Sequence, residues 1–131
     1  MNKNYRFMYL RDSYEPLKKS APIGCIVIGL TDNKQRVTYQ VSVCNPTDEF
    51  DRASGRQLAL GRLIEKPRTL TVGVRNPTMH DITREVMIDL ERAAGVPMRA
   101  RKAATKWLDS VNVYFDLSDR DDYELVPSNG W

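Results

Sequence analysis

Histidine and cysteine are scarce in this sequence: its 131 residues include one histidine, His80, and two cysteines, Cys25 and Cys44. A single histidine leaves little material for general acid–base catalysis, because histidine is the side chain most often used for it. One histidine and two cysteines 19 positions apart also do not supply the four ligands of a zinc site. Each cysteine lies in an apolar run typical of a strand, so we expect reduced thiols rather than a disulfide. His80 precedes Asp81 near the start of a predicted helix, and we expect it on the surface.

Sequence motifs of common enzymes and of membrane proteins are also missing. There is no Walker motif, no GxGxxG and no GxSxG. No run of 18 apolar residues is present, which excludes a transmembrane helix, and segment 1–16 lacks the continuous apolar region of a signal peptide. The acidic residues Asp116, Asp119, Asp121 and Asp122 lack the glycine and the terminal glutamate of a calcium loop. We therefore expect a cytoplasmic protein that is not an enzyme, contacts no membrane and holds no cofactor or metal.

Charge is unevenly distributed along the chain. The formal net charge is +3, but residues 109–131 hold six acids and one arginine, so residues 1–108 carry a net charge of +8. A basic body favours an anionic partner such as a nucleotide, a nucleic acid or an acidic protein, although a mixed solvated surface fits these numbers equally well. The composition is that of one folded domain, which we expect to span 1–117 and to be followed by an acidic C-terminal tail at 118–131.

Hydrophobic periodicity predicts an α+β fold. Alternating or continuously apolar segments predict strands, and apolar residues three or four positions apart predict helices. The expected strands are 5–10, 23–30, 36–43, 69–74 and 111–117, and the expected helices are 49–65, 79–94 and 98–110. This order, β-β-β-α-β-α-α-β, predicts an antiparallel sheet of about five strands packed against two to three helices that cover one side. The strand at 23–30 is expected at the centre of the sheet, buried on both faces.

The predicted helix at 49–65 carries one candidate for anion binding, Arg56. Asp48 or Asp51 is expected to cap this helix. An apolar arc of four residues is expected to face the core: Phe50, Ala53, Leu60 and Ile64. Arg56 lies at the border of this arc, where a half-covered arginine keeps its charge and can bind a phosphate or carboxylate through two parallel hydrogen bonds. The alternative role for Arg56 is an ion pair with a nearby acid or with an acid across a subunit interface.

Two further groups of polar and basic residues are candidates. Arg75 and Asn76 follow a strand and precede a helix, where backbone N–H groups favour an anion. Asn76 can equally serve as an N-cap alone. Four basic residues lie along the predicted third helix: Arg99, Arg101, Lys102 and Lys106. This flank either contacts an anion or forms a solvated face.

The segment CNPTDEFDRASGRQLALGRL (44–63), which follows a strand, resembles a segment of small bacteriophage accessory proteins. Among these, the chain is similar in length and element order to the first family of Thoeris anti-defence proteins. The resemblance implies an antiparallel sheet with C-terminal helices, assembly through dimers, and sequestration of cyclic ADP-ribose signals at subunit interfaces without cleavage. Of that family's ligand-binding arginines, it carries over Arg56 of the Gly55–Arg56 pair. Lys102 and Lys106 are counterparts of basic helical residues, although lysine lacks the bidentate phosphate contact of arginine.

Together these observations predict a non-catalytic phage anti-defence protein. It would bind and sequester a phosphorylated nucleotide signal, of the cyclic ADP-ribose type or a cyclic oligonucleotide, as a homo-oligomer built from dimers in the host cytoplasm. The predicted ligand-binding residues are Asn45, Arg56, Arg75, Asn76, Arg99, Lys102 and Lys106. The alternative is a small protein-binding inhibitor or a nucleic-acid-binding module, whose contact surface would be the basic flank of the third helix.

Overall fold

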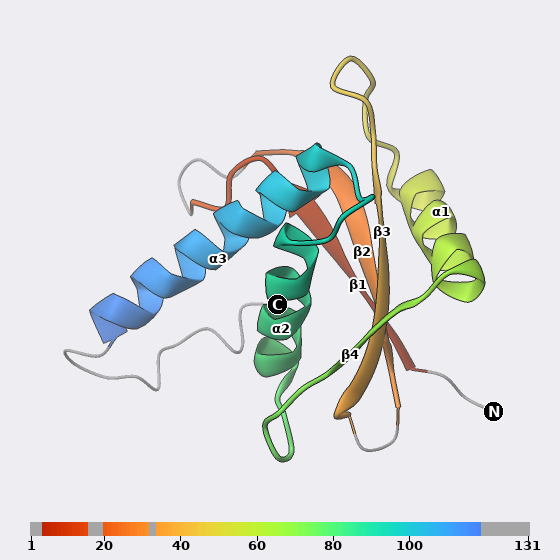
Figure 1. Cartoon of the computed structure of the whole chain (residues 1–131). Helices are drawn as coiled ribbons and strands as arrows, with labels where there is room; N and C mark the ends of the chain where they lie inside the picture. The colour runs from red at the N-terminus through yellow and green to blue at the C-terminus, as the bar shows by residue number, and fades with distance from the viewer. Residues whose placement is uncertain (1–3, 16–19, 32–33, 119–131) are drawn as a thin grey trace.

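The computed structural model describes residues 4–15, 20–31 and 34–118, with side chains up to residue 111. Within these residues, four strands form one antiparallel sheet in the order β1-β2-β3-β4 (Figure 1). The strands are β1 Asn4–Arg11, β2 Pro22–Leu30, β3 Arg36–Val43 and β4 Arg68–Thr71, and the helices are α1 Arg52–Glu65, α2 Met79–Glu91 and α3 Met98–Ser118. The predicted α+β class and antiparallel sheet are confirmed, with four strands instead of about five.

Helices cover both faces of the sheet (Figure 1). On one face, Val27 of β2 packs against Ala59 and Leu63 of α1. On the other face, α2 and α3 pack over a larger core that includes Ile26 and Ile28. The prediction that helices cover only one side is therefore wrong. The central position predicted for β2 is confirmed, and its continuous apolar sequence follows from being covered on both faces.

The strand register assigns each side chain to one of these layers. Successive side chains of a strand point to opposite faces. In β3, Val37, Tyr39 and Val41 belong to the core under α2 and α3, which confirms the predicted alternation. In β1, Phe7 pairs with Val27 and therefore lies on the face that α1 covers. β1 thus contributes a row of aromatic side chains, its odd-numbered positions, to the α1 side of the sheet.

The orientation of α1 differs from the prediction. Asp51, one of the two predicted caps, accepts a hydrogen bond from the Ser54 backbone N–H at the start of the helix. The buried residues are Gly55, Ala59 and Leu63. The arc predicted to face the core instead has an exposed Ala53, a half-buried Leu60 and an Ile64 that is 70% exposed.

Gly55 lies on the buried side of the helix. A Cβ atom at this position would lie 2.5 Å from the ring of Phe50, so glycine leaves room for this ring to pack against the helix. The Gly55 carbonyl accepts a hydrogen bond of 2.8 Å from the Ser42 hydroxyl on β3. Because glycine carries no hydrophobic signal, periodicity alone did not identify the contact face.

The strand predicted at 111–117 is wrong, because these residues continue α3 to Ser118. No glycine or proline interrupts the chain between the two predicted elements. Val111 is buried and extends the apolar stripe of Ala100, Ala104 and Leu108 at helical spacing. The helical stripe therefore continues into the segment whose alternation predicts a strand. The predicted acidic tail lies outside the described residues, except that Ser118 ends α3.

α2 begins with a capping box and brings the single histidine into the core. Thr78 accepts from the Asp81 backbone N–H at 3.1 Å, and the Asp81 carboxylate accepts from the Thr78 N–H at 2.9 Å. His80 is only 6% exposed, and its ring lies 5.9 Å from that of Trp107 on α3. The surface position expected for His80 is therefore wrong. Among the described residues, no helix is long and apolar enough to cross a membrane.

Candidate functional site

Two arginines of α1 lie over two aromatic rings of β1. The guanidinium carbon of Arg52 is 4.8 Å from the centre of the Tyr9 ring, and that of Arg56 is 4.4 Å from the centre of the Phe7 ring. Phe50 meets Tyr9 edge to face, with ring centres 6.0 Å apart. We name these five residues, Phe7, Tyr9, Phe50, Arg52 and Arg56, the arginine–aromatic cluster.

The spacing of the two elements creates this match. Phe7 and Tyr9 are two positions apart on one face of a strand, a separation of about 7 Å. Arg52 and Arg56 are four positions apart on a helix, a rise of about 6 Å. Because the two repeats are nearly equal, each arginine of α1 meets its own ring on β1, and attraction between cation and ring holds it there.

Both guanidinium groups keep their hydrogen-bond donors available. Among the described residues, neither Arg52 nor Arg56 donates a hydrogen bond or forms an ion pair, and both are exposed. The predicted alternative, an ion pair of Arg56 with an acid of its own chain, is not formed within that part of the chain. Arginine carries five N–H donors in a planar fork, so each stacked side chain can present donors to an anion.

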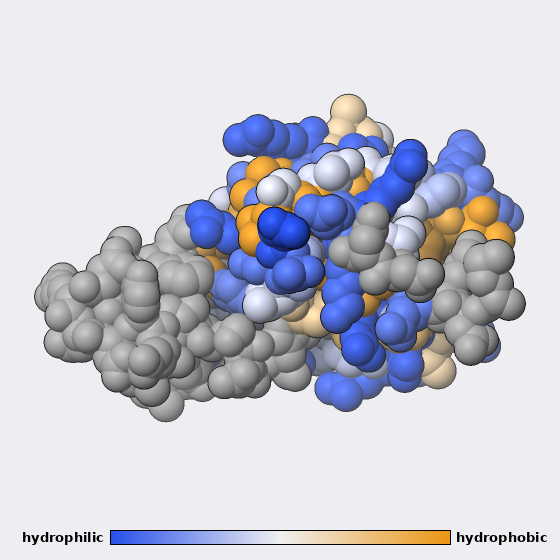
Figure 2. Space-filling model, turned by 90° about the horizontal axis from the view of Figure 1, so that it is seen from below, coloured by the Kyte–Doolittle hydropathy of each residue, from blue (hydrophilic) through white to orange (hydrophobic). Residues whose placement is uncertain are grey.

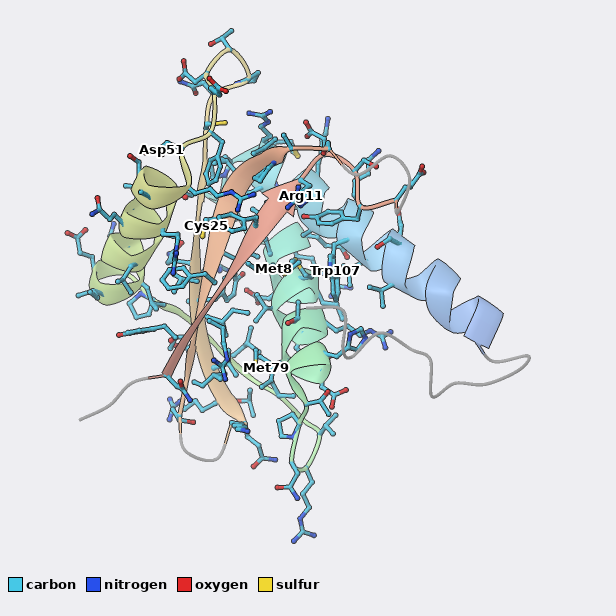
Figure 3. All side chains as sticks on the ribbon, turned by 180° about the vertical axis from the view of Figure 1, so that it is seen from behind. Met8, Arg11, Cys25, Asp51, Met79 and Trp107 are labelled. Carbon is cyan, nitrogen blue, oxygen red and sulfur yellow. The ribbon has the colours of Figure 1, made fainter. Side chains whose placement is uncertain are left out.

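The β2 strand beside the cluster carries a buried thiol, that of Cys25. Cys25 pairs with Tyr9 in the β1–β2 register and lies on the α1 side of the sheet (Figure 3). Burial raises the pKa of its thiol to about 11, against a smaller opposing effect of the Arg56 charge. Cys25 and Cys44 are both free, as predicted, and Cys25 is uncharged at neutral pH.

Asn45 and three predicted residues of α3 lie in a second place, near the end of β3. Arg99 Nη1 donates to the Cys44 carbonyl at 2.7 Å, and Arg99 Nη2 lies 3.7 Å from the Asp12 carboxylate. Arg99 thereby fastens the first turn of α3 to the chain just before Asn45. Lys102 and Lys106 are exposed and lie on the same side of α3 as Arg99, since they follow it by three and seven residues.

Arg75 and Asn76 lie in a third place, the loop between β4 and α2. Both are exposed, at the end of the sheet opposite the start of α1 (Figure 1). Thr78 rather than Asn76 caps α2, so the N-cap role considered for Asn76 is wrong. Asn76 instead adopts a φ of 51° in the loop. The seven predicted ligand residues therefore lie in three separate groups, and Arg56 alone belongs to the arginine–aromatic cluster.

The ligand residues predicted from the sequence do not include Phe7, Tyr9, Phe50 or Arg52. The available signal was the alternation of Tyr5, Phe7 and Tyr9 along one strand, combined with two arginines one helical turn apart. The sequence of either segment alone does not indicate that α1 packs beside β1, or that each arginine lies over one of the rings.

A separate cluster of polar side chains joins β3, β4 and α2. The Tyr39 hydroxyl on β3 donates to the Asp89 carboxylate on α2. Arg68 Nε on β4 donates to the Tyr39 oxygen at 3.1 Å and to Asp89 at 3.3 Å. Burial, followed by the neighbouring carboxylate, raises the pKa of Tyr39 well above its usual range. With its polar atoms satisfied by one another, this cluster holds β4 and α2 against β3.

The described residues contain no arrangement typical of a metal site or of a cysteine nucleophile. No group of three or more His, Cys, Asp or Glu side chains in that part of the chain could hold a metal ion. The sheet separates Cys25, on its α1 face, from His80 on α2. No known protein family, curated protein or solved structure matches this chain.

Proposed function

We propose that this protein binds a phosphorylated nucleotide at the arginine–aromatic cluster and does not chemically alter it. The observation that carries the proposal is that Arg52 and Arg56 are held on aromatic rings while no acceptor among the described residues uses their donors. A site that is positively charged, positioned and unpaired is suited to an anion with several acceptor oxygens.

The two kinds of side chain in the cluster fit the two parts of a nucleotide. A guanidinium fork donates two parallel, charge-assisted hydrogen bonds to a phosphate. The aromatic and guanidinium planes provide stacking surfaces for a base, worth about 1–3 kcal/mol per base in single-stranded nucleic-acid complexes. Tyr5, Phe7 and Tyr9 are half-buried, which leaves part of each side chain accessible to such a ring.

Binding without turnover is part of the proposal. Cys25 is uncharged near neutral pH, and His80 is buried against Trp107 on the other side of the sheet. Neither group is placed to act as a nucleophile or general base on a ligand over α1. A ligand recovered from the denatured complex should therefore be chemically intact.

The biological role proposed here rests on the resemblance of segment 44–63 to the Thoeris anti-defence family. In that role the protein is a phage-encoded sponge in the host cytoplasm, and its ligand is a signal of the cyclic ADP-ribose type or a cyclic oligonucleotide. Arg56, which the resemblance singles out, is also the residue that stacks on Phe7. The two independent arguments thus select the same side chain.

A thermal-shift screen tests this function directly. The panel contains cyclic ADP-ribose isomers, cyclic dinucleotides, inorganic phosphate, single-stranded DNA and duplex DNA. A ligand that binds only the folded chain at 100 times its Kd stabilises it by about 2.7 kcal/mol, which gives a measurable rise in Tm. The proposal expects a nucleotide to raise the Tm more than inorganic phosphate does. If no nucleotide raises it, the proposal is wrong.

Nucleic-acid binding is the second candidate, favoured by the exposed Lys102 and Lys106 on one side of α3. Contacts of this kind to phosphates weaken steeply with salt and show little dependence on sequence. In the same screen, this candidate expects DNA to raise the Tm at low salt, and the double variant Lys102→Ala/Lys106→Ala to abolish the rise. Arg56→Ala would leave that rise in place, which separates the two candidates.

A further inference from the structure

We propose that β1 pairs with β1 of a second copy of this chain, antiparallel and with Phe7 opposite Phe7, to extend the sheet across a two-fold axis. The interface includes Phe7 and Tyr9 of the arginine–aromatic cluster, but it forms through the open edge of the sheet and its tests need no nucleotide.

The outer edge of β1 is long and open. β1 has eight residues and pairs only with β2 among the described strands, which leaves half of its backbone N–H and C=O groups facing outward. In Figure 3, which views the molecule from behind, no helix crosses in front of β1. α1 reaches the neighbouring strands instead: Ala59 and Leu63 pack on Val27, and Arg62 donates to the Val41 carbonyl at 2.9 Å.

The other edge of the sheet is less suited to pairing. β4 has four residues and follows Pro67, which has no N–H to donate. β1 contains no proline, and between Asn4 and Leu10 its only charged side chain is Arg6. An edge strand with few charges and no proline is one that pairs readily with another strand.

Symmetry restricts the register, and three central positions of β1 pair the greatest length of the strand. When two copies of β1 pair antiparallel about a two-fold axis normal to the sheet, opposed side chains must point to the same face. One residue of β1 therefore lies opposite the same residue of the second copy, and the axis passes between these two residues. An axis at Arg6 places two guanidinium groups opposite each other, which is destabilising. An axis at Met8 opposes Tyr5 and Arg11, where the strand register shifts between Leu10 and Arg11. The axis at Phe7 avoids both faults.

With the axis at Phe7, the strand is complementary to itself. Phe7 faces Phe7 of the second copy, and Tyr5 faces Tyr9, so all aromatic residues of the α1 side meet aromatic residues. On the opposite face, Arg6 meets Met8. Cross-strand aromatic pairs stabilise the pairing of two antiparallel strands in addition to the backbone hydrogen bonds. This self-complementarity is the reason that the partner is a second copy rather than an unrelated strand.

The flank of α1 next to β1 carries apolar side chains with no core to cover them. Leu60 packs against the aromatic row of β1 and is half-buried, whereas Ile64 is 70% exposed. Helical spacing places Ala53 and Ile64 on the same flank as Leu60. These residues belong to the arc that the sequence predicts to be buried. In the proposed dimer, α1 of the second copy lies across the aromatic row of the two β1 strands and faces this arc.

Mass in solution is the first test. Light scattering of the unaltered chain at tens of micromolar should give twice the 15.0 kDa mass of one chain. A mass of one chain at that concentration overturns the proposal. This measurement needs no variant, so it does not depend on whether a substituted chain folds.

Disulfide trapping tests the edge and the register. In a Cys25→Ala/Cys44→Ser background, Tyr5→Cys and Tyr9→Cys chains are purified separately, mixed to allow subunit exchange, and oxidised. Cys25 is replaced because it lies opposite position 9 in the β1–β2 register and could form a disulfide within one chain. Opposed residues have Cα atoms about 4.5–5.5 Å apart, within disulfide range. Two Tyr5→Cys chains place their thiols about 14 Å apart along the strand, beyond that range.

The proposal expects covalent dimers in the mixture and none in either chain alone. A dimer by mass that gives no covalent product in the mixture would show that another surface or register is used, and would contradict the proposal. Cooperative thermal unfolding of each reduced variant serves as the control for folding.

Discussion

The guanidinium carbon of Arg56 lies 4.4 Å from the centre of the Phe7 ring, so the candidate site takes its charge from a helix and its ring from an edge strand. This contact fixes the direction of the arginine without using its hydrogen-bond donors. An arginine held by stacking keeps its charge and its N–H donors available for a ligand. In an arginine held by an ion pair, an acidic side chain of the protein already neutralises the charge.

Gly55 is predicted to be required for the position of α1. In Gly55→Ala, the new Cβ would approach the Phe50 ring to 2.5 Å, so the ring must shift from its edge-to-face contact with Tyr9. Overpacking of this kind costs about 1–3 kcal/mol, which outweighs a helix-propensity gain of at most about 1 kcal/mol. Chemical denaturation should therefore show a less stable variant.

Gly61→Ala is the matched control in the same helix. A Cβ at Gly61 meets nothing within 4 Å, so the helix-propensity gain is unopposed. This variant should be more stable than the unaltered chain by about 0.5–1 kcal/mol. If both alanine variants are stabilised, the close approach at Gly55 is not the reason for the orientation of α1.

The two thiols are predicted to differ in reactivity. Burial raises the pKa of Cys25 to about 11, so almost none of it is thiolate at pH 8. Cys44 is only half-buried and free. A thiol reagent added to the native protein at pH 8 should label Cys44 quickly and Cys25 only after unfolding.

Mass spectrometry of the labelled peptides identifies the reacting cysteine. A Cys44→Ser chain should take up no label until denaturant is added. Rapid labelling of Cys25 in that folded variant would mean that the face under α1 opens to solvent.

His80 is predicted to make stability depend on pH. Burial is the main cause that lowers its pKa below 6.5 in the folded state, while the unfolded chain keeps the ordinary value. As pH falls below about 6.5, the unfolded state therefore binds a proton that the folded state resists, and stability decreases. At pH above 7 the histidine is neutral in both states and contributes no pH dependence.

Urea denaturation at a series of pH values between 8 and 5 measures this effect. The His80→Gln chain provides the comparison, since glutamine does not titrate. The free energy of unfolding should fall more steeply below pH 6.5 for the unaltered chain than for the variant. Parallel curves for the two chains would remove His80 as the cause.

Much of the fold follows from local sequence patterns, and the exceptions have physical reasons. β2 and β3 are predictable because burial on two faces and on one face produce a continuous and an alternating apolar pattern, respectively. Segment 111–117 alternates like a strand, but it continues α3, whose apolar stripe extends to Val111. Gly55 lies on the buried side of α1 and has no side chain that a hydrophobic pattern could detect.

The candidate site is less predictable than the fold. Arg56 was selected from its place on a helix, but the ring that it contacts lies on β1, far away in the sequence. Arg99 was selected as a basic residue of the third helix, and its guanidinium instead binds the Cys44 carbonyl within the protein. Whether an arginine is available to a ligand depends on such long-range contacts, which leave no trace in local composition.

The affinity of Arg56 variants for the nucleotide that most stabilises the chain shows whether Arg56 binds the ligand. Isothermal titration calorimetry is performed on the unaltered chain, Arg56→Ala, Arg56→Lys and the control Arg75→Ala, which removes an exposed arginine in the loop between β4 and α2. A charge-assisted contact is worth about 1.5–3 kcal/mol, so Arg56→Ala should weaken binding about tenfold or more. Arg56→Lys should recover only part of this loss, because an ammonium cannot form the planar fork, and Arg75→Ala should bind as the unaltered chain does. Unchanged affinity in Arg56→Ala, with a fold as stable as that of the unaltered chain, would contradict the assignment of the site.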